Sequence, residues 1–495
     1  MKHLLKTFLF LAAFAGFMTA CDNSDDPNNT SGEAKLISFG FYAADNQGVL
    51  FQDYVVSDST STSWTINLPA EVDKSKLVAR FVTTKNDSVT INGVGQVSGV
   101  TVNNFTVPVD YYLTDGTNNI RYTITVGKAS AYTWSKLSSF TADSAICFTM
   151  KVNPVTSTPY ILYKEDRATS TDQKAALIKW NGTNWEYVGN SAGLSAGRIG
   201  SYLDLTFDAA GKPYVAYPDY TTTTTAQKAT VRFYNGTGWA DAGQGITAGA
   251  VTYTALSFAP DNSLMLFNVN NAAAGGLAKR ELGYSVYNGS AWTTSNTITG
   301  RTADMLTYLP VAKLVNGALY VGTFNQVAPS SFSVYKYQNG TWTTIADKMV
   351  EAGATNSNLR DFDMDVDKNG NIFIAIADNA SDAAVYKPRV KKYTAATQTW
   401  SNVGDIINVS LEDIRHFDLA VSPYGIPYLM YRNANQYPVI ISLDTDTQQW
   451  TSEVVLEQVE ADDLWLDFAP NGEAFATFSK TGGSLTTYKY AAPAN

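Results

Sequence analysis

Between residues 131 and 495, one pattern of apolar and polar positions recurs about every fifty residues. Each repeat contains a hairpin in which apolar and polar residues alternate, as in 203–217, then a third apolar strand, and finally a strand that carries a tryptophan. Alternation with a period of two is typical of β-strands buried on one face. The pattern therefore predicts four strands in each repeat. The tryptophans that mark it are Trp134, Trp185, Trp239, Trp292, Trp342, Trp400 and Trp450.

Most of these tryptophans follow a tight turn that contains Asn-Gly. Asn-Gly suits a hairpin because both residues tolerate a positive φ angle. The repeats superficially resemble those of sialidases, but the Asp-x-Gly-x-Thr-Trp core of the sialidase repeat is missing. Turns and packing therefore explain the recurring tryptophans. The turns are Asn181-Gly182, Asn235-Gly236, Asn288-Gly289 and Asn339-Gly340.

Seven hairpins and seven tryptophan strands indicate a seven-bladed β-propeller, the fold that a four-stranded repeat of this length builds. The first tryptophan strand, 131–139, precedes the first hairpin, whereas the last repeat ends at 486–490 without a tryptophan strand of its own. We expect 131–139 to pair with 486–490, because this completes the seventh blade and leaves no open edge. The propeller is then predicted over residues 131–495.

A smaller unit is predicted over residues 32–127. Its short strands, such as 36–41 and 63–68, alternate apolar and polar positions and are separated by Gly, Asn, Asp and Ser. This spacing favours a β-sandwich of about 95 residues. The segment 99–109 and the closing strand 119–126 resemble Ig-like or cadherin-like spacer domains of Gram-negative surface lipoproteins. The predicted fold class is all-β: an N-terminal Ig-like sandwich followed by the propeller.

The first twenty residues have the features of an export leader. Two lysines precede an apolar run at 8–17 that is too short to span a membrane. The small residues Thr19 and Ala20 then lead into Cys21, an arrangement that resembles a bacterial lipoprotein signal with Cys21 as the lipidated (palmitate-bearing) N-terminus. The alternative is ordinary secretory cleavage near Ala20. Only Cys147 remains as a second cysteine, so we expect no disulfide.

Residues 21–31 form an acidic, polar segment that we interpret as a flexible tether. The acidic cluster at 22–26 resembles the export signal of Gram-negative lipoproteins displayed on the outer leaflet. We therefore expect an outer-membrane protein, lipid-anchored and facing the cell exterior. The alternative is a plain spacer that leaves the protein facing the periplasm.

Composition and residue types argue against several classes of function. With 45 acidic and 35 basic residues the formal net charge is −10, so nucleic acid is not an expected partner. Beyond the leader the chain has one histidine, His416, too few for the two histidine ligands of a propeller copper oxidase. The stretch 365–372 matches the first positions of an EF-hand loop, but Ile376 stands at the twelfth position, so it reads as a hairpin turn.

From these observations we expect no metal, no cofactor and no enzymatic activity. One alternative stays open, a glycosidase or lyase whose carboxylates meet over the channel of the propeller. The acidic residues for that alternative are Asp304, Asp361, Asp462 and Asp463.

The expected binding surface is one face of the propeller. Loops between the second and third strands share that face with the segments that lead into each blade, and both are long here, whereas the opposite face has short turns such as 208–211. Arginine, Asp and Asn hydrogen-bond sugar hydroxyls, and aromatic rings stack on the apolar face of a sugar. The arginines could instead brace neighbouring blades. The candidates for glycan binding are Arg198, Tyr202, Tyr220, Tyr253, Arg301, Arg360, Asp378, Arg415, Arg432, Asn433, Tyr437 and Trp465.

The order of leader, acidic tether, Ig-like spacer and C-terminal binding domain resembles the surface glycan-binding lipoproteins of starch-utilisation-type polysaccharide uptake systems. The resemblance implies non-catalytic capture of a polysaccharide or oligosaccharide, which we expect to be neutral. It further implies delivery to an outer-membrane transporter and its partner lipoprotein, with membrane contact through the lipid anchor only. The competing interpretation is a surface protein-interaction scaffold.

Overall fold

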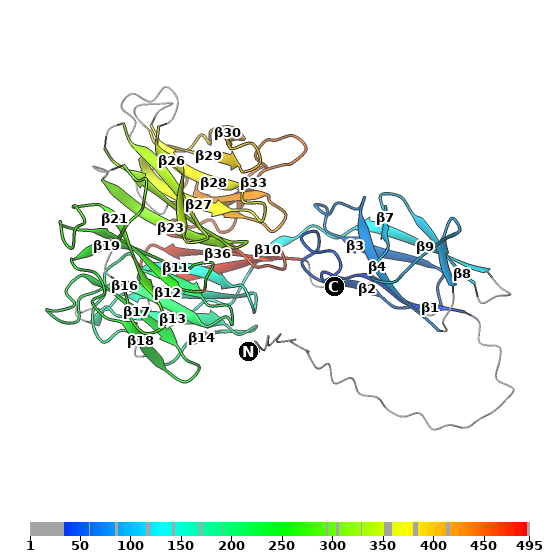
Figure 1. The fold of residues 1–495 in the computed structure, drawn as a ribbon, viewed down its shortest axis with the longest axis horizontal. Coiled ribbons are helices and arrows are strands. Elements are labelled where there is room, and N and C mark those ends of the chain that lie inside the picture. The colour runs from blue at the N-terminus through cyan, green and yellow to red at the C-terminus, as the bar shows by residue number, and fades with distance from the viewer. Residues whose placement is uncertain are drawn as a thin grey trace, which may run out of the picture.

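The computed structural model describes residues 34–492 except for 59, 85–87, 115–118, 141–143, 168, 170–171, 192, 294–295, 303–305, 328, 351–358, 380–384 and 412–415. The described elements are strands β1–β37, arranged in nine sheets that form two lobes (Figure 1). The predicted leader and the whole tether, Cys21 included, lie outside the described residues. Within the described part of the chain, no helix is long and apolar enough to cross a membrane.

The smaller lobe is a sandwich of two sheets. Their strand orders are β2-β1-β4-β7 and β3-β9-β8-β5-β6, and β3 pairs with β9 in parallel. Two sheets confirm a β-sandwich here, while the Ig-like resemblance stays a prediction. The strands are β1 (Leu36–Phe41), β2 (Tyr54–Val56), β3 (Ser63–Leu68), β4 (Leu77–Thr83), β5 (Ser88–Ile91), β6 (Val94–Gly95), β7 (Val102–Asn103), β8 (Val109–Thr114) and β9 (Asn119–Lys128).

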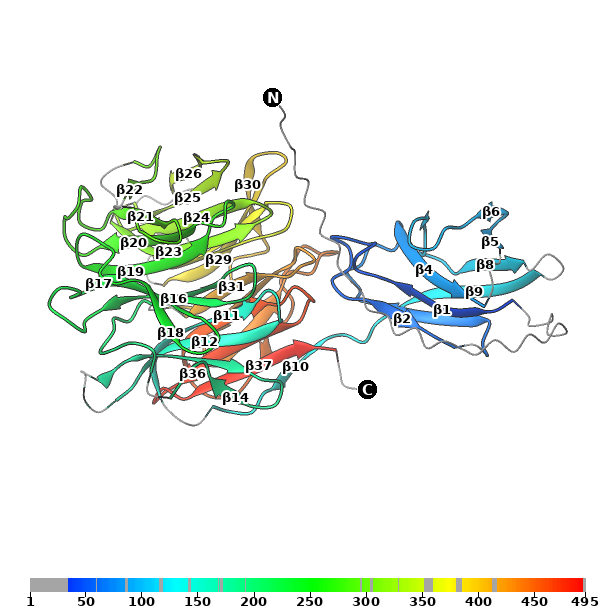
Figure 2. The same ribbon diagram turned by 60° about the horizontal axis from the view of Figure 1, so that its bottom comes forward.

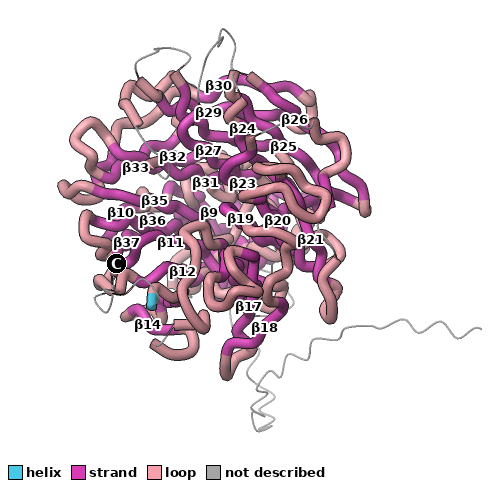
Figure 3. Tube along the Cα trace, turned by 90° about the vertical axis from the view of Figure 1, so that its left-hand side faces the viewer, coloured by secondary structure: helices cyan, strands magenta, loops and turns pink. Residues whose placement is uncertain are grey.

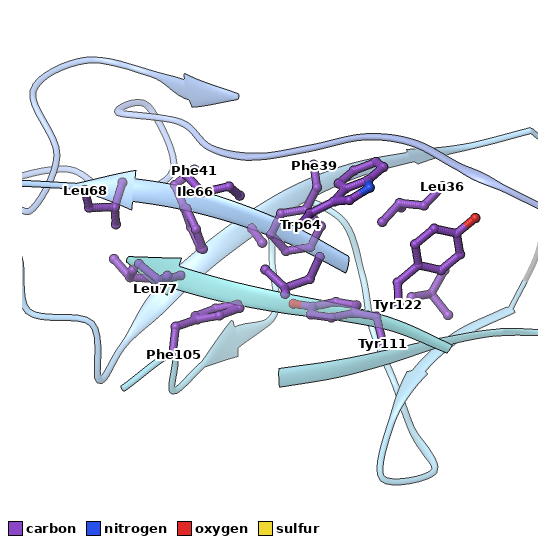
Figure 4. Packing of buried hydrophobic residues seen from close by; sticks show 14 of the residues in the cluster. Leu36, Phe39, Phe41, Trp64, Ile66, Leu68, Leu77, Phe105, Tyr111 and Tyr122 are labelled. Atoms are coloured by element: carbon purple, nitrogen blue, oxygen red, sulfur yellow. The ribbon is translucent and has the colours of Figure 1, made fainter. Parts of the chain in front are cut away.

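Alternating side chains build the core of the sandwich. In β3, Trp64 and Ile66 are buried while the residues between them are exposed, as the period of two requires. Aromatic rings from the two sheets meet edge to face, with the centroids of Phe39 and Tyr111 5.1 Å apart (Figure 4). Such contacts add to the free energy gained by burying the rings.

The larger lobe contains seven four-stranded sheets around a central axis, as Figure 3 shows. The inner strands contact one another in ring order, from β11 through β15, β19, β23, β27, β31 and β35 back to β11. This confirms the seven-bladed propeller. The first four blades contain β11 (Ala145–Asn153), β12 (Thr158–Glu165), β13 (Ala175–Trp180), β14 (Trp185–Tyr187); β15 (Asp204–Phe207), β16 (Pro213–Asp219), β17 (Lys228–Tyr234), β18 (Trp239–Gly243); β19 (Val251–Phe258), β20 (Leu264–Asn270), β21 (Leu282–Tyr287), β22 (Asn296–Thr297); β23 (Thr307–Val315), β24 (Ala318–Asn325), β25 (Ser331–Gln338) and β26 (Thr341–Met349).

The last three blades complete the ring. The seventh is built from both ends of the lobe, because β10 pairs antiparallel with β37 and places Trp134 opposite Tyr490. The predicted closure is therefore confirmed. These blades contain β27 (Leu359–Val366), β28 (Ile372–Asp378), β29 (Lys387–Thr394), β30 (Thr399–Val403); β31 (Phe417–Val421), β32 (Pro427–Arg432), β33 (Pro438–Ser442), β34 (Val454–Val455); β35 (Ala461–Phe468), β36 (Ala474–Lys480), β37 (Leu485–Ala491) and β10 (Thr133–Lys136).

Several of the repeated tryptophans brace neighbouring blades at the rim. The indole N–H of Trp239 donates to the carbonyl of Val188 on the preceding blade at 2.9 Å, and that of Trp292 donates to Ala242 at 3.0 Å. A Cβ atom at Gly189 would lie 2.8 Å from the Trp239 nitrogen, so the ring needs a glycine there. These contacts confirm that packing explains the repeat.

Aspartates brace the blades near the axis. The Oδ2 atom of Asp204 accepts a hydrogen bond from the backbone N–H of Leu256 at 2.7 Å, and that of Asp467 accepts from Val152 at 2.7 Å. In each case the acceptor lies on one inner strand and the donor on the inner strand of the next blade. Charge-assisted bonds of this kind are stronger than neutral ones. The same arrangement holds for Asp363, Asp365 and Asp418, and Asp361 accepts from His416, just before the next inner strand.

The sandwich lies against the face of the propeller that carries the short turns. The rings of Phe51 and Tyr424 meet edge to face at 5.1 Å, and Lys368 donates to the backbone carbonyl of Gly48. Tyr424 and Lys368 belong to turns between the first and second strands of their blades. The long-loop face therefore points away from the sandwich, as Figures 1 and 2 show.

Candidate functional site

The central channel opens on the long-loop face into a cavity of about 130 Å³, which we call the mouth cavity. The inner strands supply most of its wall, together with the segment 201–203 that leads into β15. Tyr202, Tyr253 and Trp465 contribute rings, and Leu309, Phe362 and Phe417 contribute further apolar surface. A second cavity of about 560 Å³ opens on the short-turn side, where Phe51 of the sandwich contributes to its wall.

Two lysines and several aspartates lie between the two cavities. Lys151, Lys313 and Asp467 line both. The Nζ atom of Lys313 lies 3.2 Å from Oδ1 of Asp365 and 3.7 Å from Oδ1 of Asp467. Burial lowers the pKa of Lys313, but the surrounding carboxylates raise it overall, so the ammonium stays charged. These ion pairs cross the channel and join three blades.

Asp363 and Asp418 form a hydrogen-bonded acid pair in the floor of the mouth cavity. Burial is the main cause that raises the pKa of both carboxyls, and the charge of Asp363 raises that of Asp418 further. Asp418 therefore holds a proton and donates it to Asp363. Two carboxyls in direct contact are closer than the roughly 5–9.5 Å at which glycosidases place their catalytic pair. This pair is thus not a glycosidase pair by geometry.

The acidic residues of the glycosidase alternative do not come together in the described structure. Asp361 lines the mouth cavity, but its Oδ1 accepts from the N–H of Phe362 at 3.0 Å and its Oδ2 from that of His416 at 3.2 Å. Asp462 is exposed, and neither it nor Asp463 lines the mouth cavity. Asp304 lies outside the described residues.

Two matches to the Gly-x-Ser-x-Gly pattern, at 189–193 and 193–197, also carry no nucleophile role. They follow β14, not a strand that leads into a helix, which is the context of a nucleophile elbow. Ser195 is buried, accepts from the N–H of Ala175 at 3.0 Å and donates to the carbonyl of Gly197 at 2.7 Å. The Ser195 hydroxyl therefore holds the segment after β14 against the start of β13.

The sequence 365–372 forms the hairpin turn that was predicted. The N–H groups of Asn369 and Asn371 donate to Oδ1 of Asp367 at 2.8 and 2.9 Å, and the side-chain amide of Asn371 donates to its Oδ2. Both oxygens of the Asp367 carboxylate therefore accept hydrogen bonds from within the turn.

Tyrosines and an arginine gather beside the mouth cavity. The ring centroids of Tyr202 and Tyr253 lie 4.2 Å apart, and those of Tyr253 and Tyr308 lie 5.6 Å apart. The guanidinium of Arg280 lies 4.7 Å from the centroid of Tyr308 and 5.5 Å from that of Tyr253. We call these four residues the tyrosine–arginine cluster. Burial raises the pKa of Tyr253, so its hydroxyl stays protonated.

Sequence analysis missed Arg280 and Tyr308. Arg280 lies in the loop between the second and third strands of its blade, and Tyr308 is near the start of an inner strand, so both belong to the segments that were singled out. Arg280 adopts a φ of 60°, an uncommon value outside glycine. Nothing in the sequence predicts the positive φ angle of Arg280 or the stacking of its guanidinium on the tyrosine rings.

Trp465 and the Arg198–Tyr220 pair are placed on the predicted face. Trp465 is half-buried, lines the mouth cavity and packs against the cluster that contains Phe148. Arg198 is exposed, and its guanidinium lies 5.1 Å from the ring centroid of Tyr220. The Tyr220 N–H also donates to the Arg198 carbonyl at 3.0 Å, which joins the two loops.

Other predicted residues make internal contacts. The Arg301 side chain is 3% exposed, pairs with Glu281 at 3.3 Å and donates to Thr307 at 2.9 Å, and burial lowers its pKa. Arg432 bonds to the ring of His416 at 2.8 Å. The side chains of Arg301 and Arg432 therefore hold neighbouring segments of the protein together.

The remaining candidates form a loop or are not described. Asn433 accepts from the backbone N–H of Tyr437 at 3.1 Å, so both residues shape the loop after β32. Arg360 lies in β27 and Asp378 ends β28, but their side chains are not described. Arg415 lies outside the described residues.

No protein-family model and no curated protein matches this sequence. Solved structures do resemble it. A polysaccharide lyase, ulvan lyase, has a TM-score of 0.49 at 11% identity, over 72% of this chain and 96% of that one. An α-L-arabinanase from Penicillium chrysogenum complexed with arabinobiose gives 0.39 at 10% identity, over 58% and 92%. An α-L-arabinofuranosidase from Fusarium graminearum gives 0.41 at 9% identity, over 59% and 93%. These neighbours are propeller-type carbohydrate-active proteins.

The comparisons correct one expectation from the sequence. We expected no enzymatic activity because recognisable catalytic motifs are missing, and that expectation is wrong. The structures that resemble this chain include a polysaccharide lyase, an α-L-arabinanase and an α-L-arabinofuranosidase. The lack of familiar motifs was not evidence against catalysis.

Proposed function

We propose that this protein binds an extracellular polysaccharide or oligosaccharide at its mouth cavity and supports its uptake into the cell. The observation that carries the proposal is the set of aromatic rings that line a hollow on the long-loop face. The partly exposed rings of Tyr202 and Trp465 line it, and the buried ring of Tyr253 packs against Tyr202. Aromatic faces stack on the apolar faces of sugars, and the flanking polar groups hydrogen-bond hydroxyls.

The position of the sandwich supports this function. It lies against the short-turn face, so it leaves the long-loop face accessible in the described structure. We further propose that Cys21 is lipidated and holds the protein on the outer membrane, facing the exterior. An outer-membrane transporter and its partner lipoprotein are the proposed recipients of the glycan.

Cleavage of the bound polysaccharide is a second candidate function. The observation that favours it is Asp418, a carboxyl that burial keeps protonated in the floor of the mouth cavity. A carboxyl that stays protonated near neutral pH can serve as a general acid. If cleavage occurs, Asp418→Asn should abolish product formation while polysaccharide binding remains.

Affinity electrophoresis of the chain without residues 1–21 against a panel of polysaccharides tests the proposal, with product analysis over time in the same samples. We expect retardation by at least one polysaccharide, and a several-fold weaker effect for Tyr202→Ala because one stacking surface is lost. Tyr112→Ala, a half-buried tyrosine of the sandwich, is the matched control. Products that grow with time would establish cleavage. Binding to none of the polysaccharides would overturn the proposal and favour the protein scaffold.

A further inference from the structure

Arg280 has a buried nitrogen without an acceptor. Its guanidinium lies over Tyr308 and Tyr253, at 4.7 and 5.5 Å from the ring centroids, while its Nη1 atom is buried and makes no hydrogen bond to the described residues. A buried donor left unpaired costs free energy, so nearly all such groups in native proteins have a partner. Arg280 does not itself line the mouth cavity, but its guanidinium lies against Tyr253, which does. A ligand that extends from the cavity to this guanidinium can accept the missing hydrogen bond.

The nearest acidic neighbour in sequence does not fulfil that role. The Oε1 atom of Glu281 accepts from Arg301 at 3.3 Å, and its Oε2 accepts from the backbone N–H of Ala278 at 2.6 Å. In the mouth cavity, Asp204 and Asp361 each accept backbone N–H groups of the next blade. These carboxylates are thus engaged elsewhere.

Further cations lie on the same side of the long-loop face. Arg198, next to the segment that contains Tyr202, is exposed over the ring of Tyr220. Lys164, at the end of β12, is 4% exposed; burial lowers its pKa and the nearby charge of Arg198 lowers it further. Together with Arg280, these cations come from the first three blades, on the long-loop side, although the whole chain carries −10.

We propose that the mouth cavity selects an acidic polysaccharide, whose sugar ring stacks on Tyr202 while its anionic group accepts hydrogen bonds from Arg280. The anionic group is a uronate carboxylate or a sulfate ester, since both offer the paired oxygens that a guanidinium fits. This inference rests on the proposed function and names its substrate class. It replaces the neutral polysaccharide expected from the sequence.

The test compares affinities of the chain without residues 1–21 for three classes of polymer. Alginate and polygalacturonate supply carboxylates, carrageenan supplies sulfate esters, and laminarin and starch are neutral. We expect binding to an acidic polymer, weakened about tenfold or more in Arg280→Gln, because a charge-assisted hydrogen bond is lost. The matched control is Arg121→Gln, which removes an exposed arginine from the sandwich and should leave the affinity unchanged.

The outcomes separate this inference from the proposed function. If a neutral polymer binds as tightly as any acidic one, the inference is overturned while the proposed function stands. The same conclusion follows if Arg280→Gln has an unchanged melting temperature and unchanged affinity for the acidic polymer. Should Arg280→Gln fail to fold, Arg198→Gln replaces it, with a loss of affinity expected from this exposed cation and no loss overturning the inference. Binding to no polymer at all rejects the proposed function itself.

Discussion

Single side chains near the axis serve both the fold and the mouth cavity. Asp204 accepts a backbone hydrogen bond from the next blade, pairs with Lys151 at 2.7 Å and also lines the cavity. Trp465 packs against buried residues and presents ring surface to the same cavity. Substitutions at such positions change stability and binding together, so matched variants are needed to separate the two.

Trp465→Ala should lower the free energy of unfolding and weaken polysaccharide binding. The ring is half-buried, so the loss of stability should be about 3 kcal/mol, the lower end of the range for buried tryptophans. Trp465→Phe keeps much of the packing and should recover most of that stability. Chemical denaturation and affinity electrophoresis of both variants check this. An alanine variant as stable as wild type would show that the ring is not packed as described.

The acid pair predicts a specific pH dependence of stability. Asp418 keeps its proton in the folded protein, whereas an unfolded Asp loses it near pH 4. The folded state therefore binds more protons above that pH, and the free energy of unfolding falls as pH rises until Asp418 itself ionises. An asparagine at position 418 resembles the protonated carboxyl but does not titrate. The variant therefore avoids this fall in the free energy of unfolding as pH rises.

Asp418→Asn should thus gain stability relative to wild type as pH rises from 4 to 8, by about 1.4 kcal/mol for each unit by which the pKa is raised. Denaturation at a series of pH values measures the difference. Asp462→Asn controls for the loss of one carboxylate. A difference between Asp418→Asn and wild type that stays constant with pH would contradict the shared proton.

The sequence was informative about residues wherever position along a strand decides their place. Tyr202 lies just before β15, and Tyr253 and Trp465 lie within β19 and β35; their positions along these strands bring them to the mouth cavity. Sequence analysis did not predict Arg280 as a site residue, because its stacking depends on a positive φ angle and on a tyrosine from the next blade. Arg301 was misplaced on the binding surface because its burial depends on Glu281 from another loop.

At the level of elements, the repeat determines the fold. Regular spacing of hairpins and tryptophans was enough to predict seven blades and the strand that closes them, because each blade repeats the same alternation and the same turns. The unpaired first tryptophan strand revealed the closure, which the pairing of β10 with β37 confirms. Charged contacts across the channel, such as Lys313 with Asp365 and Asp467, involve blades far apart in sequence and left no local pattern.

Removing β10 should destabilise the propeller more than removing the sandwich. Deletion of residues 21–127 keeps every propeller strand, whereas deletion of 21–140 also removes β10 and leaves β37 with an unpaired edge. The second truncation should melt several degrees lower or aggregate. Thermal unfolding of the two proteins side by side is the measurement. Equal melting temperatures would show that the closure contributes little.

At the level of the whole molecule, the proposed anchor and the described lobes fit one arrangement. The proposed anchor at Cys21 precedes the sandwich in sequence, and the propeller follows it with its long-loop face pointing away from the sandwich. This order would present the mouth cavity to extracellular glycans.

Replacing the anchor should release the protein from the membrane. Cys21→Ala removes the proposed lipid, and fractionation should then find the protein outside the membrane fraction. Replacing Asp25 and Asp26 with Ala keeps the lipid and should reduce exposure on intact cells, measured by external protease. Full protease accessibility of that double variant would identify the acidic cluster as a plain spacer.

The central claim is that the polysaccharide binds at the mouth cavity, and hydrogen–deuterium exchange with and without a bound polysaccharide tests it most directly. We predict slower exchange in the loops at 197–202 and 271–281, which surround the tyrosine–arginine cluster, because the ligand covers them. The short turns at 208–211 and 261–263, on the opposite face, should exchange as before. Protection confined to those turns or to the sandwich would contradict the account.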